Sequence, residues 1–276
     1  MKSGLLKRIL AVTALTTVLT TAGLSVNNSV QASQLSDKTI TIGVTGGPHE
    51  QIAEQVKKLA KKDGLTVKVK VFSDYNTPNS ALQSGDLDAN SYQTLPFLKE
   101  QEKNKGYKFK TAFKTISFPM GIYSKKIKSI KDLKKGDTIA VPNDPANETR
   151  ALQLFQKAGV IKLKKGVGQN ATKNTIASNP KHVKIVELDA AQLPRQLGEV
   201  TAAAINGNYA QSNGLSVKND SLFHEPLSKN QYPNYFVVKT GHQNDKVIKQ
   251  LEKYYHSKAI KKFVKEEFKG SVFVSD

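Results

Sequence analysis

The chain has 276 residues, of which 38% are hydrophobic and 24% charged, and its formal net charge at pH 7 is +19. This length and composition are typical of a globular protein with one large or two medium domains. The sequence contains no cysteine, which excludes disulfides, thiolate metal sites and a cysteine nucleophile.

Residues 1–32 predict a secretory signal peptide. Lys2, Lys7 and Arg8 precede the apolar stretch ILAVTALTTVLTTAGLSV, and small residues flank an expected cleavage site after Ala32. The alternative is a retained membrane anchor, although five threonines and one glycine weaken this stretch as a transmembrane helix. We therefore expect the protein to be exported.

The positive charge predicts attraction to polyanions. The predicted signal peptide has three basic and no acidic residues, so its removal lowers the formal net charge from +19 to +16. We predict no nucleic-acid partner, because no RNP-type, helix-turn-helix or zinc-finger pattern accompanies the charge. An anionic cell wall or membrane surface fits an exported protein better, and a simply solvated lysine surface is the alternative.

The first predicted structural unit is a strand, a helix and a second strand. The β-branched alternation of KTITIGVT predicts a strand over 38–45, and GGPHE opens a helix that ends at KKDG. LTVKVKVFS predicts the second strand over 65–73. Such a unit indicates two parallel strands joined by a right-handed crossover.

The alternation of helices and strands continues to the C-terminus. A clear helix runs through NETRALQLFQKAG and is capped by Gly159, and the tail from Asn244 predicts amphipathic helices. Further short helices are expected over 79–84, 95–104 and 191–200, and strands over 111–124, 138–141, 183–190, 201–206 and 234–240. The pattern predicts an α/β fold in which a second lobe interrupts the first.

Polar and small residues stand at the ends of several predicted strands. Ligands of open α/β sheets bind beyond the carboxyl ends of the strands. Gly46-Gly47, Tyr75, 143–147 and Asn206 follow predicted strands, and Asn234 begins one. We expect the binding site to be built from these positions.

Signs of catalysis are absent from the sequence. It contains no HExxH, GxSxG or GxxxxGK[ST] motif. Its five histidines show no metal-ligand spacing, and surface or capping roles are expected for each. Asp86 and Asp88 are interpreted as turn caps. We predict no enzyme activity, no cofactor and no metal.

The remaining polar residues suit a small zwitterion. Arg150 can bind a carboxylate through two parallel hydrogen bonds, and the nearby helix N-terminus would add unpaired N–H groups. Asn206 and Asn234 offer donors and acceptors, while Tyr75 and Tyr92 can enclose an apolar side chain. The alternatives are a surface ion pair for the arginine, turn formation for the asparagines and core packing for the aromatic residues.

Long segments of the sequence resemble the NlpA lipoprotein family, the substrate-binding subunits of methionine ABC importers. The segments are FSDYNTPNSALQSGDLDANSYQ, AVPNDPANETRALQLFQKAGVIKL, NPKHVKIVELDAAQLPRQL and AAINGNYA. The resemblance implies a two-lobed periplasmic-binding-protein fold of type II-like architecture. It places 33–121 with 227–276 in lobe 1 and 122–226 in lobe 2. The implied partners are a methionine-like amino acid and the membrane permease of an ABC importer.

The resemblance also implies the role of each site residue. Arg150 would bind the ligand carboxylate, and Asn206 and Asn234 would bind the amino and carboxylate groups. Tyr75 and Tyr92 would line the side-chain pocket, and Asn147 would shape the turn before the helix.

The sequence departs from the family in two places. Thr94 stands where family members often carry a histidine, so a methionine derivative or a short methionine peptide is an alternative ligand. Leu24 stands about where the family's lipid-carrying cysteine would fall, so we expect an exported protein without a lipid anchor. A charge-retained adhesion or sensing protein on the same fold is the alternative function.

Overall fold

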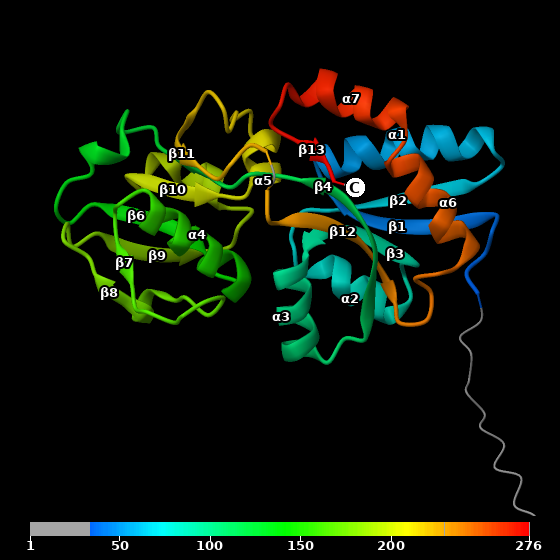
Figure 1. Cartoon of the computed structure of the whole chain (residues 1–276), viewed down its shortest axis with the longest axis horizontal. Helices are drawn as coiled ribbons and strands as arrows, with labels where there is room; N and C mark the ends of the chain where they lie inside the picture. The colour runs from blue at the N-terminus through cyan, green and yellow to red at the C-terminus, as the bar shows by residue number, and fades with distance from the viewer. Residues whose placement is uncertain (1–33, 229, 276) are drawn as a thin grey trace, which may run out of the picture. The chain divides into compact units, whose positions relative to one another are not determined.

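Figure 1 presents a computed structural model that describes residues 34–228 and 230–275. The predicted signal peptide, 1–32, lies outside the described residues. Among the described helices, none combines the length and the apolar character that crossing a membrane requires.

A six-stranded sheet forms lobe 1. Its strands are β1 (Thr39–Thr45), β2 (Thr66–Phe72), β3 (Ala89–Thr94), β4 (Phe109–Ser117), β12 (Pro233–Lys239) and β13 (Phe273–Val274). They are arranged in the order β13-β4-β12-β3-β1-β2. β1 pairs in parallel with β2 and β3, whereas β12 is antiparallel to β3 and β4. The predicted parallel unit at the start of the chain is therefore confirmed.

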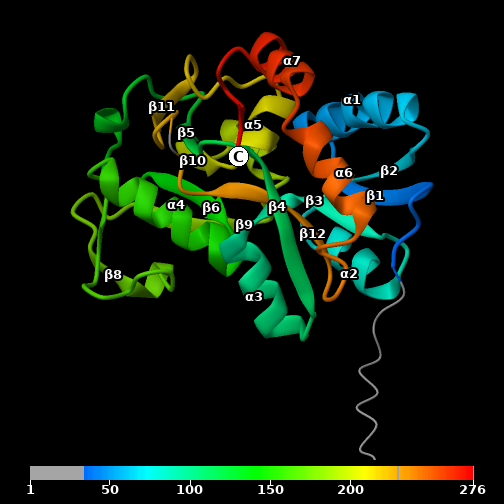
Figure 2. The ribbon, with the colours of Figure 1, turned by 45° about the vertical axis from the view of Figure 1, so that its right-hand side comes forward.

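Helices cover both faces of this sheet (Figures 1 and 2). They are α1 (Pro48–Lys62), α6 (Lys246–Tyr255) and α7 (Lys258–Phe268) on one face, and α2 (Thr77–Ser84) and α3 (Leu95–Lys105) on the other. In β12, Phe236 and Val238 join the core beneath α1, whereas Val237 joins the core beneath α2 and α3. This alternation lets an almost wholly apolar strand bury both of its sides.

A five-stranded sheet forms lobe 2. Its strands are β5 (Gly121–Tyr123), β6 (Thr138–Pro142), β9 (Lys184–Leu188), β10 (Ala202–Ile205) and β11 (Ser221–His224), in the order β11-β5-β10-β6-β9. The lobe also contains α4 (Pro145–Lys157), α5 (Gly207–Ser212), the small pair β7 (Lys162–Leu163) and β8 (Ile176–Ser178), and the 3-10 helices η1 (Ile130–Asp132), η2 (Lys173–Thr175) and η3 (Leu193–Gly198). α4 packs on one face of the sheet, and η3 and α5 pack on the other.

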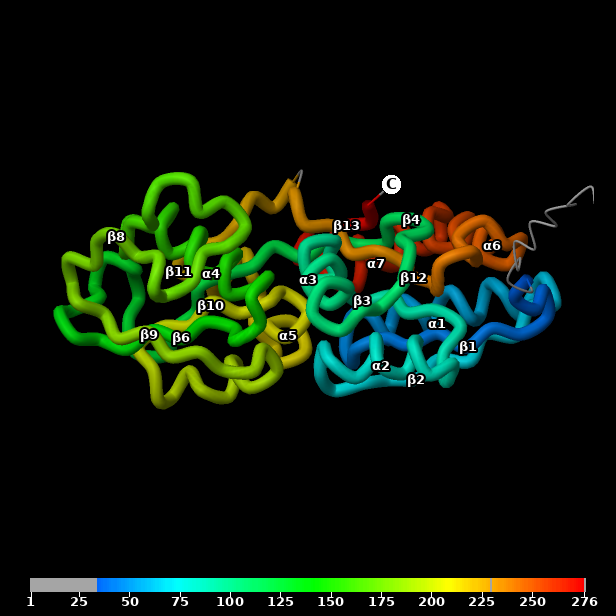
Figure 3. The backbone as a smooth tube through the Cα atoms, turned by 90° about the horizontal axis from the view of Figure 1, so that it is seen from below, coloured from blue at the N-terminus to red at the C-terminus, as the bar shows by residue number. Residues whose placement is uncertain are grey.

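Two crossover segments connect the lobes, and Figure 3 shows the second of them running from β11 to β12. The first spans 118–120, between the end of β4 and the start of β5. The second spans 225–232, between β11 and β12. Because β12 inserts between β3 and β4, lobe 1 is complete only after the chain has built lobe 2 and returned.

The strand β3 was not expected from the sequence, from which no element was predicted over 89–94. Its residues, ANSYQT, are mostly polar, yet five of the six are buried. A network of side-chain amides explains this burial. Gln93 Nε2 donates to the side-chain oxygens of Asn79 (2.7 Å) and Asn90 (2.8 Å), and Asn79 Nδ2 donates back to Gln93 (2.9 Å). Buried polar side chains are tolerated when they bond one another in this way.

Gly207 fits tightly against the first crossover. A Cβ at this position would lie 2.7 Å from Phe118 Cβ and 2.7 Å from the Pro119 carbonyl oxygen. These atoms belong to a buried turn and cannot rotate away as the end of a flexible side chain could. The first residue of α5 must therefore be glycine for the crossover to keep its path.

We expect Gly207→Ala to lower the free energy of unfolding by about 1–3 kcal/mol, because overpacking strains a dense interior. Urea denaturation of wild type and variant measures the loss. Gly198→Ala is the matched control, since a Cβ there meets no atom within 4 Å. Equal losses in the two variants would contradict the explanation.

Candidate functional site

One cavity between the lobes collects the residues that the sequence singled out. Its atom-free volume is about 330 Å³, counting its open side, which is near the lower end of the range for small-molecule sites. It is lined by Tyr75, Tyr92, Gln93, Thr94, Phe97, Phe118, Asn147, Arg150, Asn206, Gly207, Asn208 and Asn234. All seven predicted ligand-binding residues therefore lie around one space, and their roles toward a ligand stay predictions.

The cavity lies where parallel strands of both sheets end. Tyr75 follows β2, Thr94 ends β3, and Asn206 follows β10. Asn147 and Arg150 lie on α4, which begins three residues after β6 ends. This is the position at which open α/β sheets bind ligands.

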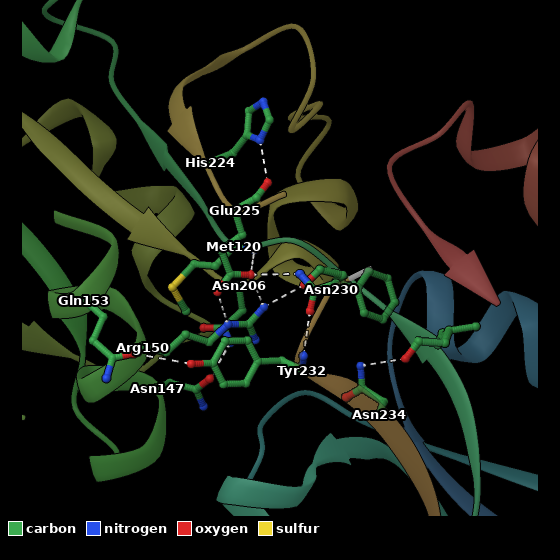
Figure 4. Close-up of polar contacts among 12 residues, drawn as sticks. Met120, Asn147, Arg150, Gln153, Asn206, His224, Glu225, Asn230, Tyr232 and Asn234 are labelled. Atoms are coloured by element: carbon green, nitrogen blue, oxygen red, sulfur yellow. Dashed lines mark hydrogen bonds and ion pairs between the residues drawn. The ribbon is translucent and has the colours of Figure 1, made fainter. Parts of the chain in front are cut away.

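Arg150 is buried and already carries a partner (Figure 4). Its Nε and Nη2 donate to the two carboxylate oxygens of Glu225, at 2.7 and 2.6 Å, and Nη2 also donates to the Phe118 carbonyl at 2.7 Å. Tyr232 lies over the guanidinium, with 4.3 Å between Cζ and the ring centroid. Nη1 donates to no described residue, so this nitrogen remains available to a ligand.

The ion pair of Arg150 and Glu225 differs from the unpaired cation that the sequence led us to expect. Burial acts to lower the pKa of Arg150, but the Glu225 carboxylate outweighs burial and raises it above its ordinary value. Burial likewise acts to raise the pKa of Glu225, and Arg150 holds it below its usual range. Both groups are charged at neutral pH. The arginine is therefore half of a buried ion pair and not an isolated cation.

The expectation of free N–H groups at the start of α4 is wrong in one respect. Asp144 caps the helix: its Oδ1 accepts from the Asn147 N–H at 2.9 Å, and the Asn147 side-chain amide bonds both carboxylate oxygens. Burial raises the pKa of Asp144 to about 6. An anion of the protein thus already occupies the helix end, because aspartate is among the best N-cap residues.

Two asparagines point unpaired polar atoms into the buried interior. Asn206 Nδ2 donates to Asn147 Oδ1 at 2.7 Å, which leaves Asn206 Oδ1 buried without a partner. Asn208 Oδ1 accepts from the Tyr75 hydroxyl, which leaves Asn208 Nδ2 buried without a partner. Each unmet group costs about 1–3 kcal/mol. One acceptor and one donor at a cavity therefore favour a bound molecule that supplies the complementary groups.

Asn234 adds a further amide at the same cavity. Its Nδ2 donates to the Ile116 carbonyl at 3.2 Å (Figure 4). Its Oδ1 accepts no hydrogen bond from the described residues. The Asn234 side chain is thus fixed to lobe 1, and its Oδ1 can still accept a hydrogen bond.

Aromatic rings form the apolar wall of the cavity. The Tyr75 ring lies 6.0 Å from Tyr92, 5.8 Å from Phe97 and 4.7 Å from Tyr209, measured between centroids. The Tyr92 hydroxyl donates to the Tyr75 carbonyl at 2.8 Å, which fixes the two tyrosines relative to each other. Such a wall suits a flexible apolar chain, and sulfur–aromatic contacts make a thioether a good occupant.

The family follows from comparison with known proteins. Residues 40–274 match the protein family described as NlpA lipoprotein. The chain belongs to the NlpA lipoprotein family. This NlpA family member is 43% identical over 234 residues to the D-methionine-binding lipoprotein MetQ of Salmonella typhimurium, which covers 84% of this chain and 86% of the relative. It is 42% identical to outer membrane lipoprotein 3 of Mannheimia haemolytica, over 84% of this chain and 89% of that one.

Solved structures share the two-lobed fold. A nutrient-binding protein from Burkholderia cenocepacia, bound to methionine, aligns with a TM-score of 0.84 and 49% identity over 86% of this chain and all of its own. Protein PG110 from Staphylococcus aureus aligns with a TM-score of 0.81 and 41% identity over 86% of this chain and 94% of its own. The predicted fold class is thereby confirmed.

Several residues of the NlpA site were missed in the sequence. Glu225 lies in no recognised segment, Asn208 and Tyr209 lie in AAINGNYA but were not singled out, and Phe97 lies in a predicted helix. Physical chemistry offers a signal only for Glu225, because a buried arginine requires a counter-charge.

His49 was expected at the surface or in a cap, and that expectation is wrong. It is 3% exposed, and its ring packs 4.9 Å from that of Phe118. Burial lowers the pKa of His49 to about 3, so the ring is neutral at pH 7. The Asp86 carboxylate accepts locally from Ser84 Oγ at 2.7 Å. The Asp88 carboxylate does not cap a turn, because it accepts from the Thr41 N–H in β1 at 2.7 Å. No cluster suited to a metal ion occurs among the described residues.

Because Asp144 is buried, we expect the stability of the folded protein to depend on pH. Its pKa is about 6 in the folded protein and near 3.8 without burial, so the folded state binds more protons between these values. Stability contributed by this group therefore falls as pH rises from 4 to 7. Asp144→Asn removes the titration and keeps a good N-cap.

We expect the free energy of unfolding of Asp144→Asn, relative to wild type, to rise between pH 4 and pH 7 by up to about 3 kcal/mol. Chemical denaturation at several pH values measures the difference in free energy of unfolding between variant and wild type. The contributions of all other titrating groups cancel in this difference. The exposed Asp86→Asn is the control for loss of a surface carboxylate. A relative stability that stays flat or falls over this range would exclude the buried, titrating carboxylate.

Proposed function

We propose that this protein is the extracytoplasmic substrate-binding protein of an ABC importer and that its ligand is methionine or a close relative of methionine. The observation that carries the proposal is the pair of unmet buried atoms, Asn206 Oδ1 and Asn208 Nδ2, beside Arg150 Nη1 in one aromatic-walled cavity. Similarity to a D-methionine-binding lipoprotein, MetQ, and to a methionine-bound nutrient-binding protein supports it.

In this proposal the cavity binds the two ends of a zwitterion separately. The ligand carboxylate accepts from Arg150 Nη1 and Asn208 Nδ2. The ligand ammonium donates to the Oδ1 atoms of Asn206 and Asn234. These contacts satisfy the groups that the protein leaves unmet, so their desolvation cost is recovered only when ligand is bound.

The ligand's side chain extends toward Tyr75, Tyr92 and Phe97. Burying a methionine side chain contributes about 1.5–3 kcal/mol, whereas micromolar affinity requires about 8 kcal/mol. The polar contacts must therefore supply much of the difference. Thr94, half-buried at the cavity, is smaller than the histidine expected in the family, so a bulkier methionine derivative or a short methionine peptide is the second candidate ligand.

Ligand entry requires the lobes to separate. Contacts cross the cleft beside the cavity: Tyr209 Oη donates to the Ser73 carbonyl at 3.3 Å, and Ser212 Oγ to the Gly46 carbonyl at 3.4 Å. We place the hinges in the crossovers, in keeping with lobes spanning 33–121 with 227–276 and 122–226. Closure around a ligand that bonds both lobes is a hinge motion of a familiar kind.

The closed form would then dock on a membrane permease. The relatives of this chain are lipoproteins by name, but the 276-residue sequence contains no cysteine to carry a lipid. We propose that it is exported without a lipid anchor and is held at the cell by attraction of its basic surface to anionic wall or membrane polymers.

Calorimetry with L- and D-methionine on the purified protein tests the function. Arg150→Ala would leave Glu225 buried without a partner and the ligand carboxylate without its cation, at a cost on the order of 3–5 kcal/mol. We expect the variant to bind methionine about 10² to 10³ times more weakly than wild type.

Arg195→Ala is the matched control, because Arg195 is exposed on η3. A melting temperature for each variant separates loss of fold from loss of binding. Binding of methionine by Arg150→Ala as tightly as by wild type would refute the assignment, as would an absence of methionine binding by wild type.

Gly47 offers a test of closure. It has φ +85°, and a Cβ there would lie 2.0 Å from Ser212 Oγ and 3.1 Å from Ser212 Cβ, on the opposite lobe. Gly64 has a similar φ of +78° in the same lobe, but a Cβ there meets nothing within 4 Å. Both alanine variants therefore carry a positive φ, and Gly47→Ala adds the strain of ψ −132° and the contact across the cleft.

We expect Gly64→Ala to lower stability by about 1 kcal/mol and Gly47→Ala by about 1–3 kcal/mol. Only Gly47→Ala should weaken methionine binding, by roughly tenfold. Calorimetry and denaturation measure the two effects. Equal affinities in the two variants would show that the lobes need not meet at Gly47 for binding.

A further inference from the structure

Glu225 is the most heavily bonded acid beside the cavity, although it does not line the cavity. Its side chain is 6% exposed. Oε1 accepts from Arg150 Nε, and Oε2 accepts from Arg150 Nη2, the Met120 N–H at 2.9 Å and Asn230 Nδ2 at 3.0 Å. Met120 belongs to the first crossover and Asn230 to the second. The acid is therefore fixed by both segments that join the lobes (Figure 4).

The buried charges around the cavity do not sum to a cation. Arg150 is positive, Glu225 is negative and makes two hydrogen bonds to it, and Asp144, the N-cap of α4, is a further acid within the same interior. The predicted mature protein carries a formal charge of +16, since three of the +19 charges lie in the signal peptide. The surface thus attracts anions while the cavity offers no net positive charge to hold them.

We propose that Glu225 is a specificity-determining residue: by cancelling the charge of Arg150, it makes the cleft select net-neutral zwitterions over monoanions of the same shape. The inference rests on the function proposed above and names the property that separates accepted from rejected ligands. Methionine brings a carboxylate and an ammonium together and adds no net charge to the buried site. An anionic analogue would add an uncompensated charge, which a buried site disfavours strongly.

A purely structural role makes a different prediction. If Glu225 only held the Arg150 side chain in place, removing its charge would weaken every carboxylate-bearing ligand by about the same factor. If it sets specificity, the ratio between a zwitterion and an anion changes. The ratio of two dissociation constants is therefore the decisive readout, and general loss of affinity or stability is not.

Two ligands of nearly equal shape supply the ratio. Methionine is the zwitterion, and 2-hydroxy-4-(methylthio)butanoate, in which a hydroxyl replaces the ammonium, is the monoanion. Calorimetry at pH 7.5 measures both on wild type, Glu225→Gln and Glu225→Asp. Glu225→Asp keeps the charge and shortens the side chain, so it is the matched control.

We expect wild type to prefer methionine by at least about tenfold, and Glu225→Gln to reduce this preference by about tenfold or more, since an adjacent charge alters ionic equilibria by one to three powers of ten. Glu225→Asp should keep the preference within about threefold of wild type, even if both ligands bind more weakly.

A preference in Glu225→Gln that stays within twofold of wild type would overturn the inference and leave the proposed function intact. Should Glu225→Gln fail to fold, wild type alone decides: binding of the hydroxy acid as tightly as methionine overturns the inference. If wild type binds neither ligand, the proposed function fails, and the inference fails with it.

Discussion

The buried pair of Arg150 and Glu225 is the interaction on which the organisation of the site depends. Taking two charges out of water costs several kcal/mol per ion unless geometry and further hydrogen bonds satisfy both groups. Here the carboxylate accepts from the guanidinium and from both crossovers, and the guanidinium also bonds the Phe118 carbonyl. The pair thus ties α4 to the two segments that connect the lobes. It also fixes the direction of the arginine and leaves one nitrogen, Nη1, without a partner among the described residues.

The path of the chain explains why the site forms at this junction. β12 returns from lobe 2 to the interior of the first sheet, between β3 and β4, so the crossovers must pass beside one another. The carboxyl ends of β1, β2 and β3 then face those of β6 and β10, and the polar residues that follow these strands meet across the cleft. Aromatic residues of lobe 1 and amides of lobe 2 complete one cavity, which neither sheet could enclose by itself.

Prediction from the sequence succeeded where a short-range pattern carries the information. The period-two run of β1 and the helical spacing of α4 are visible in a few residues, and the observed elements lie within two residues or so of the expected ranges. β3 was missed because its burial depends on hydrogen bonds between its side-chain amides and that of Asn79, which lies outside the strand. Five of the seven predicted site residues lie within the family segments, and Thr94 and Asn234 lie outside them. Glu225 belongs to no motif that was recognised, and Asn208 was not singled out within AAINGNYA; the importance of both rests on contacts distant in sequence.

The sequence by itself determined the class of fold, the family and the absence of cysteine chemistry, because hydrophobic period, motif order and composition are local properties that need no coordinates. Only the tertiary structure decided which charge faces Arg150, since Glu225 lies 75 residues away along the chain. It also decided that Asp144 occupies the start of α4, that His49 is neutral and buried, and that Asn206 and Asn208 each keep one unmet atom. These facts depend on which side chains, distant in sequence, are buried next to one another, and a sequence pattern does not show that.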